Sequence, residues 1–212
     1  MNKLVYSVHI MNDNQKEDAT TLGILNAIDD KNDITQRHLA ARLNVALGLT
    51  NSYLKRCIHK GLVKVHQAPA NRYLYYLTPK GFTEKSRLTS AYLSSSFNFY
   101  RGASTSINQI YQKCEESNLN NLLLCGISEI AEIALVRSHD RNLKITGVFD
   151  PESKKESFLG LPVIKNIEKI SSYDAYIITA LEDAQNLYSL IVNEIDSNLV
   201  FTPSILGINS KQ

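Results

Sequence analysis

The chain has 212 residues, of which 43% are apolar, and a formal net charge of +2, which allows one large or two small globular domains. It has no apolar run of about 18 residues, and its first residues lack a signal-peptide pattern, so we expect neither a transmembrane helix nor secretion. Residues 1–88 carry 13 Lys and Arg against seven Asp and Glu, whereas residues 89–212 carry 10 against 14. This asymmetry predicts two domains with different partners, the first of them suited to phosphates.

Three helices and a hairpin are predicted in the first part of the chain. Residues 18–32 have apolar side chains at helical spacing, and Thr35 can cap a second helix. Residues 49–61 form a third helix with the i, i+3, i+4, i+7 spacing of a buried stripe, made of Thr50, Tyr53, Leu54 and Cys57. The alternating segments LVKVHQ and RYLYYLT flank a Pro/Asn turn, which predicts a hairpin. Residues 1–78 are therefore expected to form a winged helix-turn-helix domain.

In a winged helix-turn-helix, the third helix enters the major groove of DNA, where Asn, Lys and Arg side chains can read bases or hold phosphates. The start of the second helix and the tip of the wing, near Gln67, lie close to the backbone in this docking mode. The alternative is a protein-interaction module whose basic side chains are only a solvated surface. The candidate DNA-binding residues are Gln36, Arg37, Thr50, Asn51, Ser52, Lys55, Arg56 and Arg72.

Two segments of this part resemble a known family. They are ITQRHLAARLNVALGLTNSYLKRCIHKGLVKV and RYLYYLTPKGFTEKSRLT, which are similar to the MarR-type winged-helix regulators associated with exopolysaccharide gene clusters. The resemblance covers about residues 20–89, and the YLYYLTPKGFTEKSRLT stretch is its most specific part. It implies a transcription regulator, usually dimeric, although this wing is short and has few lysines.

Residues 79–118 are expected to be a helical connector. Pro79 suits the first position of a helix capped by Thr78, and the segment SSSFNFYRGAS is poor in helix formers, so we expect a break near Gly102. The aromatic side chains of the connector either pack against the chain's own domains or form the seam of a homodimer. A dimer is favoured by function, because winged-helix proteins usually read two half-sites.

Residues 119–212 alternate strands and helices, which predicts a Rossmann-like parallel sheet. Its ligands are expected beyond the carboxyl ends of the strands. Gly126 precedes a helix N-terminus that favours phosphate, and Asp150 follows 24 residues later, near the spacing of an acid that binds ribose hydroxyls. Asp150 could instead belong to a plain turn, and the sheet could be purely structural. The candidate ligand-binding residues are Gly126, Ile127, Ser128, Glu129, Asp150, Pro151, Thr179, Ala180, Thr202 and Pro203.

The segments LLLCGISEIAEIALV, LKITGVFDPES and FLGLPVIKNIEKI resemble Rossmann-type domains that carry nucleotide-sugars or dinucleotides. That resemblance implies a nucleotide-type ligand. Ser128 and Ala131 replace the second and third glycines of the G-x-G-x-x-G fingerprint, which counts against NAD(H). A nucleotide-sugar or related nucleotide is therefore our first expectation, with NAD(H) as the alternative.

No catalytic pattern is evident. The five histidines pair with no nucleophile, and no G-x-S-x-G, P-loop lysine or H-E-x-x-H motif occurs. The three cysteines, Cys57, Cys114 and Cys125, are widely spaced and predict reduced core residues and no metal site. We expect a cytoplasmic homodimer that is not an enzyme, binds operator DNA and senses a nucleotide-sugar, without a membrane partner. The alternatives are an NAD(H)-responsive repressor, an adaptor that binds no DNA, and a sugar-nucleotide enzyme.

Overall fold

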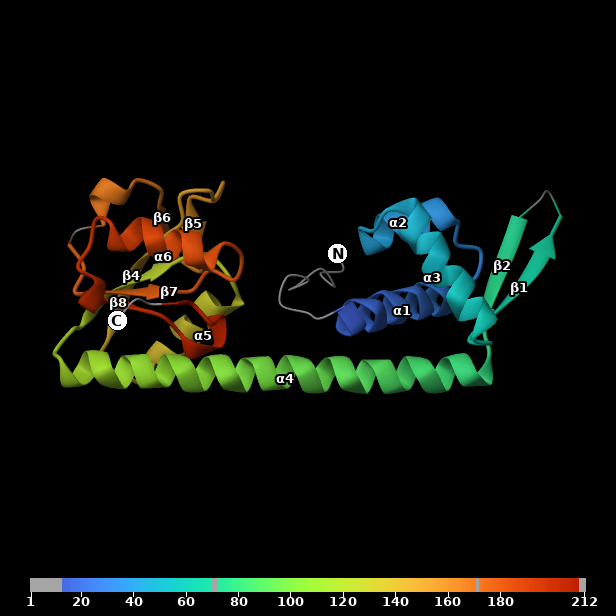
Figure 1. Ribbon diagram of the computed structural model, residues 1–212, viewed down its shortest axis with the longest axis horizontal. Helices are drawn as coiled ribbons and strands as arrows, with labels where there is room; N and C mark the ends of the chain where they lie inside the picture. Colours follow the sequence, from blue (N-terminus) through green and yellow to red (C-terminus); the bar gives the residue numbers. More distant parts are fainter. Residues whose placement is uncertain (1–12, 70–71, 171, 210–212) are drawn as a thin grey trace. The chain divides into compact units, whose positions relative to one another are not determined.

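The computed structural model describes residues 13–69, 72–170 and 172–209. The chain divides into two compact units, Met1–Ser96 and Phe97–Gln212. The long helix α4, Pro79–Glu116, contributes its first part to unit 1 and its last part to unit 2 (Figure 1). The predicted boundaries at residues 78 and 118 therefore differ from the observed division, because the connector is shared between the two units instead of forming a body of its own.

Unit 1 is a winged helix, as predicted. The hydroxyl of Thr35 accepts a hydrogen bond from the His38 amide at 3.2 Å, which caps the second helix, and Asn44 ends that helix in the left-handed conformation. Its elements besides α4 are α1 (Asp13–Asp30), α2 (Gln36–Leu43), α3 (Leu47–His59), β1 (Val63–Ala68) and β2 (Arg72–Leu77).

The core of unit 1 lies between its helices and the base of the wing. Ile24 and Leu25 of α1, Leu39 of α2 and Leu54 of α3 are almost completely buried, and Leu88 of α4 packs into the same cluster. The two strands of the wing pair antiparallel, with Val63 opposite Leu77 and Ala68 opposite Arg72. The packing leaves the opposite surface of α3 and the distal part of the wing in solvent.

Unit 2 is a six-stranded Rossmann-like sheet with the order β5-β6-β4-β3-β7-β8. Every neighbouring pair is parallel except β5 with β6. The strands are β3 (Asn121–Cys125), β4 (Lys144–Phe149), β5 (Ser157–Phe158), β6 (Leu161–Ile164), β7 (Ala175–Ile178) and β8 (Val200–Phe201). The helices are α5 (Glu129–Ser138), α6 (Ala184–Val192) and the short turns η1 (Ile167–Lys169), η2 (Ser197–Leu199) and η3 (Ser204–Leu206).

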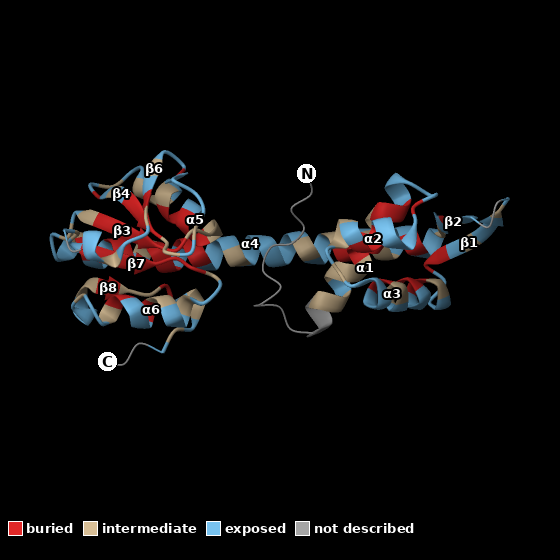
Figure 2. Ribbon diagram, turned by 90° about the horizontal axis from the view of Figure 1, so that it is seen from above, coloured by how far each residue is buried: buried red, intermediate tan, exposed pale blue. Residues whose placement is uncertain are grey.

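Helices cover both faces of this sheet, so its central strands are buried on both sides (Figure 2). On β3, Leu122 and Leu124 join a cluster with α5 and the last part of α4, whereas Leu123 and Cys125 join a second cluster with α6. Successive strand residues point to opposite faces, which explains why the run LLLC has no polar residue.

The break predicted near Gly102 is wrong, because α4 is helical without interruption from Pro79 to Glu116. Helix propensity is a weak preference that tertiary packing overrides. Ala103, Ile107 and Tyr111 are fully buried, and the Tyr111 hydroxyl donates a 2.7 Å hydrogen bond to the Ala134 carbonyl of α5. Packing against α5 and the sheet therefore keeps this segment helical.

No helix in the described ranges is long and apolar enough to cross a bilayer. The three cysteines are free and buried. Burial raises the pKa of the Cys57 and Cys114 thiols from 9.0 to about 11 and raises that of Cys125 as well. The cysteines are thus core residues, as the sequence predicted.

These raised pKa values predict slow thiol chemistry. At pH 8 the native protein is expected to react with iodoacetamide at least about 100-fold more slowly than the urea-unfolded chain, since the thiolate is the nucleophile and burial disfavours it. The rate should rise as the pH approaches the raised pKa of about 11. Mass spectrometry of timed samples measures it, and fast labelling of one cysteine per native chain would contradict the buried positions.

Candidate functional site

The exposed surface of α3 is polar and basic from Ser52 to His59, after the exposed Leu47 and Leu49 at the start of the helix. Ser52, Lys55 and His59 follow one another at steps of three and four residues, so they share one side of the helix, and all three are exposed. Leu54 and Cys57 lie on the buried side. Ser52 and Lys55 were predicted from the sequence, whereas His59 was missed. The step of four residues from Lys55 to His59 was the signal that could have identified it.

Two predicted residues of α3 are less available than expected. Thr50 is fully buried, and its hydroxyl donates to the Ala46 carbonyl at 3.1 Å. This corrects its assignment to the DNA-binding surface, because a residue of the buried stripe cannot also face the groove. Asn51 is partly buried, and its side-chain oxygen is buried without a hydrogen-bond partner among the described residues.

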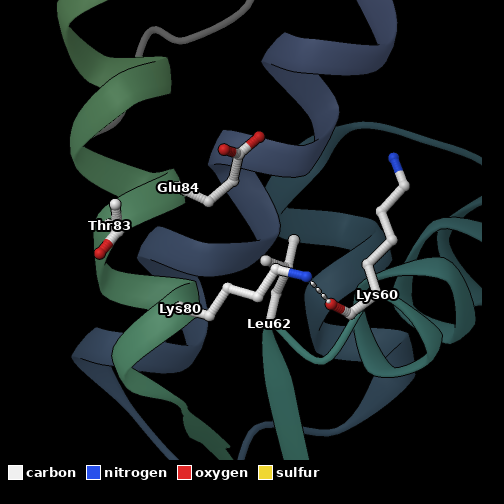
Figure 3. A pocket seen from close by; sticks show the side chains of 5 residues that line it. All are labelled: Lys60, Leu62, Lys80, Thr83 and Glu84. Carbon is white, nitrogen blue, oxygen red and sulfur yellow. Dashed lines mark hydrogen bonds between the residues drawn. The ribbon is translucent and has the colours of Figure 1, made fainter.

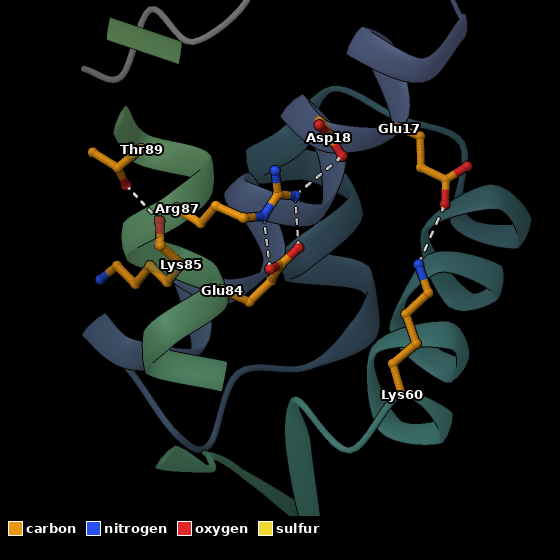
Figure 4. Close-up of polar contacts among 7 residues, drawn as sticks. All are labelled: Glu17, Asp18, Lys60, Glu84, Lys85, Arg87 and Thr89. Atoms are coloured by element: carbon orange, nitrogen blue, oxygen red, sulfur yellow. Dashed lines mark hydrogen bonds and ion pairs between the residues drawn. The ribbon is translucent and has the colours of Figure 1, made fainter. Parts of the chain in front are cut away.

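Arg56 lies on the edge of the exposed surface of α3, beside α1. Its guanidinium is 3.2 Å from a carboxylate oxygen of Glu17 and 5.4 Å from the centre of the Tyr53 ring. The other Glu17 oxygen is 3.8 Å from the Lys60 ammonium, an ion pair drawn in Figure 4. The sequence singled out Arg56, but its acidic partner lies 39 residues away, and no local pattern indicates it.

The remaining predicted DNA-binding residues lie on α2 and the wing. Gln36 begins α2 and its amide nitrogen is 3.4 Å from the Tyr75 hydroxyl. Arg37 is exposed in the same turn, and Arg72 is exposed at the start of β2. Gln67 is exposed and pairs in register with Tyr73. These side chains are in solvent, available to a partner.

A shallow hollow of about 400 Å³ lies beside the start of α4, lined by Lys60, Leu62, Lys80, Thr83 and Glu84 (Figure 3). The Lys80 ammonium donates to the Lys60 carbonyl at 2.9 Å. The pKa of Glu84 is lowered, first by its hydrogen bond from Arg87 and then by the charges of Arg87, Lys60 and Lys80. The hollow is therefore lined by positive and negative side chains together with the apolar Leu62.

In unit 2, the ends of the central strands are bonded to one another where a ligand was predicted. The Gly126 amide donates to the Phe149 carbonyl at 2.8 Å, and the Thr179 hydroxyl donates to the Gly126 carbonyl at 2.6 Å. Gly126 has a φ of +102°, and a Cβ there would lie 2.6 Å from the Ala180 backbone. Gly126, Thr179 and Ala180 are thus brought together, with Thr179 fully buried.

Two donors at the start of α5, where phosphate was expected, already have partners inside the chain. The Ile127 amide donates to the Asp150 carboxylate at 3.0 Å. The Ser128 hydroxyl caps α5 by accepting from the Ile130 amide at 3.0 Å, and it donates to the Thr179 carbonyl. The Ile127 amide therefore orients one oxygen of Asp150 just before α5, and the other oxygen can accept a hydrogen bond from a ligand hydroxyl. Glu129, the first residue of α5, is partly buried.

The last three predicted residues lie on the borders of this site. Pro151 follows Asp150 in a turn, so the turn that the sequence left as an alternative is present. Thr202 and Pro203 follow β8, which pairs with β7. Pro203 is buried, and the next residue, Ser204, donates its amide to the Ser106 hydroxyl of α4 at 2.6 Å. This hydrogen bond thus connects the segment after β8 to α4.

Residues 17–64 match the family described as winged helix-turn-helix DNA-binding. No curated protein matches the chain. Among solved structures, MepR, a transcription regulator of the Staphylococcus aureus multidrug efflux pump MepA, is 23% identical with a TM-score of 0.34, over 39% of this chain and 61% of MepR. The MarR family transcription regulator SP03579 is 21% identical with a TM-score of 0.36, over 46% of this chain and 66% of that protein.

A third structure matches most of the chain. It is the O-methyltransferase NcsB1 from neocarzinostatin biosynthesis, in complex with S-adenosylmethionine and a naphthoic acid, which is 13% identical with a TM-score of 0.41. The match covers 92% of this chain and 81% of the enzyme. Our prediction that the chain is not an enzyme is withdrawn on this match, and a likeness at 13% identity concerns the fold alone.

Proposed function

We propose that the protein is a transcription regulator of the MarR type, whose unit 1 binds operator DNA. The observation that carries this proposal is that residues 17–64, which match a DNA-binding family, expose the Ser52, Lys55 and His59 side of α3. A helix with this surface can lie in the major groove, where its cation and hydroxyl reach bases and phosphates. The exopolysaccharide resemblance suggests polysaccharide biosynthesis genes as the regulated targets.

The test is a gel-shift titration of the protein with its own upstream DNA and with an unrelated duplex of equal length. Specific binding should be at least about 1000-fold tighter than binding to the unrelated duplex. Equal affinity for both duplexes would contradict a regulator that reads sequence, and no binding to either would contradict the proposed function.

We also propose that unit 2 senses a nucleotide-sugar or related nucleotide at the carboxyl edge of its sheet, with NAD(H) as the alternative ligand. Support comes from Asp150, whose carboxylate is oriented by the Ile127 amide and can accept hydrogen bonds from a pair of ribose hydroxyls. Because Asp150 occupies the first amide of the turn, the phosphates of the ligand are expected to contact other donors. Ligand binding would shift DNA affinity through different affinities for two states.

Replacing Asp150 with asparagine is expected to weaken the ligand by about tenfold to 100-fold, since it removes a charged acceptor but keeps an oxygen for the Ile127 amide. Thermal-shift titrations with nucleotide-sugars, nucleotides, NAD and NADH measure this effect, because a ligand raises the melting temperature. Glu152→Gln, a change at an exposed acid two residues away, is the matched control. If the ligand raised the melting temperatures of Asp150→Asn and Glu152→Gln equally, the role of Asp150 would be contradicted.

A hollow along the first part of α4, in unit 1, suits a second copy of the chain. Phe82 and Leu93 are 50% and 47% exposed, and with Ser86 and Thr89 they line one hollow of unit 1. In chain order these four residues are separated by steps of four, three and four, the spacing of side chains that form the contact, or seam, between two packed helices. A homodimer formed at this seam would present two copies of α3 to two half-sites.

Leu93→Glu is expected to convert the dimer to a monomer and to lower operator affinity by at least about tenfold, because it replaces an apolar side chain of the seam with a charge that the interface would bury. Sedimentation equilibrium measures the assembly. Ala91→Glu adds the same charge at an exposed position two residues away, which does not share the seam, and should remain dimeric. A Leu93→Glu protein with unchanged mass in solution would show that the seam lies elsewhere.

A further inference from the structure

Glu17 of α1 lies between two cations, Arg56 of α3 and Lys60, which directly follows that helix. One carboxylate oxygen is 3.2 Å from the Arg56 guanidinium and the other is 3.8 Å from the Lys60 ammonium. Arg56 and Lys60 are four residues apart, so they line one edge of the α3 region. Figure 4 shows the Glu17 side chain reaching from α1 toward Lys60. A single acid thus pairs with two cations at one edge of the exposed surface of α3 and lowers their combined charge by one.

These ion pairs are open to solvent. The side chains of Arg56 and Lys60 are 55% and 61% exposed, and that of Glu17 is 35% exposed. Exposed pairs of this kind are weak and are screened by salt. A DNA phosphate that approaches the edge of α3 can therefore replace the Glu17 carboxylate, and both anions satisfy the same donors.

Lys60 lies near a second carboxylate besides that of Glu17. Glu84 faces the same hollow (Figure 3), and Lys60 contributes to the lowered pKa of its carboxyl group, so Lys60 is close to two carboxylates. By contrast, no ion pair involves Lys55 among the described residues, and it stays exposed in the middle of the α3 surface. Lys60 therefore has carboxylates beside it, whereas Lys55 has no ion-pair partner among the described residues.

We propose that Glu17 is a specificity-determining residue that acts as an internal counter-anion. It competes with DNA phosphates for Arg56 and Lys60 and so lowers sequence-independent affinity, which depends on phosphate contacts. The bases then contribute a larger share of the binding through Ser52, Lys55 and His59. This inference rests on the proposed DNA-binding function of unit 1.

Glu17→Gln tests the inference with a fluorescein-labelled duplex of arbitrary sequence, about 30 base pairs long, in anisotropy titrations at several salt concentrations. The variant is expected to bind about threefold to tenfold more tightly than the wild type at low salt, as the loss of a weak competing pair allows. The slope of log affinity against log salt should steepen by about one.

Asp29→Asn is the matched control, because Asp29 also lies on α1 and pairs with a cation, Lys85 of α4, at 2.6 Å. It changes the net charge equally without touching α3. A second arm combines Glu17→Gln with Arg56→Gln and Lys60→Gln, where the gain from Glu17→Gln should disappear.

An equal gain in Asp29→Asn would assign the effect to net charge and overturn the proposal. Weaker binding by Glu17→Gln would also overturn it, since Glu17 would then orient Arg56 for DNA. If wild type and variant both fail to bind the duplex at low salt, the proposed function itself fails. If wild type binds and Glu17→Gln equals it, only the role of Glu17 fails.

Discussion

Lys55→Glu is expected to lower the affinity of the protein for operator DNA by about 100-fold, more than any other single substitution on the exposed surface of α3. Lys55 is exposed in the middle of that surface, where a cation contacts phosphate or guanine. The substitution removes that contact and adds an anion facing the DNA backbone. Gel-shift titration at fixed salt measures the change, and circular dichroism should show an unaltered helix content.

The control for Lys55→Glu is Lys113→Glu, an equal charge change at an exposed position of α4 in unit 2. It should lower DNA affinity by no more than about threefold, as expected for a distant, screened charge. If the two variants bind DNA equally, α3 does not face the DNA, and the assignment of the recognition helix is wrong.

Gly126→Ala is expected to lower the free energy of unfolding of unit 2 by about 3 kcal/mol or more, a large loss for a single methyl group. The residue has a φ of +102°, and its Cβ would lie 2.6 Å from the backbone of Ala180, so both conformational strain and overlap oppose the methyl group. Urea unfolding followed by circular dichroism measures the loss. DNA binding by unit 1 should persist in conditions where unit 2 has unfolded, if the units fold separately.

Gly160→Ala separates the two causes. Gly160 has a φ of +83°, but a Cβ there meets no atom within 4 Å, so the change carries the conformational cost alone, about 1 kcal/mol. A Gly126→Ala protein that is no less stable than Gly160→Ala would mean that the contact with Ala180 yields easily. The close approach of β3 and β7 at this turn would then not require glycine.

The elements with a repeating apolar pattern were predictable. The stripe of α3 has helical spacing, and the run LLLC of β3 is apolar on both faces, because its sheet is covered on both sides. The cap at Thr35 was predictable for a local reason, since its partner is the His38 amide three residues away. Gly126 was predictable as the turn residue of a strand-turn-helix.

Contacts between distant segments were not predictable. Glu17 and Arg56 are paired across 39 residues, and the Ile127 amide is bonded to an acid 23 residues away, so no short window of sequence contains either interaction. Propensity also failed at Gly102, where packing against α5 and the sheet keeps α4 helical. Thr50 was assigned to both the buried stripe and the DNA-binding surface. It is fully buried, so it belongs to the stripe.

The most direct test of the central claim is the affinity of the wild-type protein for duplex DNA at two salt concentrations. If unit 1 binds DNA through its basic α3 surface and wing, affinity should fall by at least about tenfold between about 50 mM and 200 mM salt, because phosphate contacts release counterions. Affinity that does not change with salt would contradict a DNA-binding winged helix, and so would no binding at about 50 mM salt.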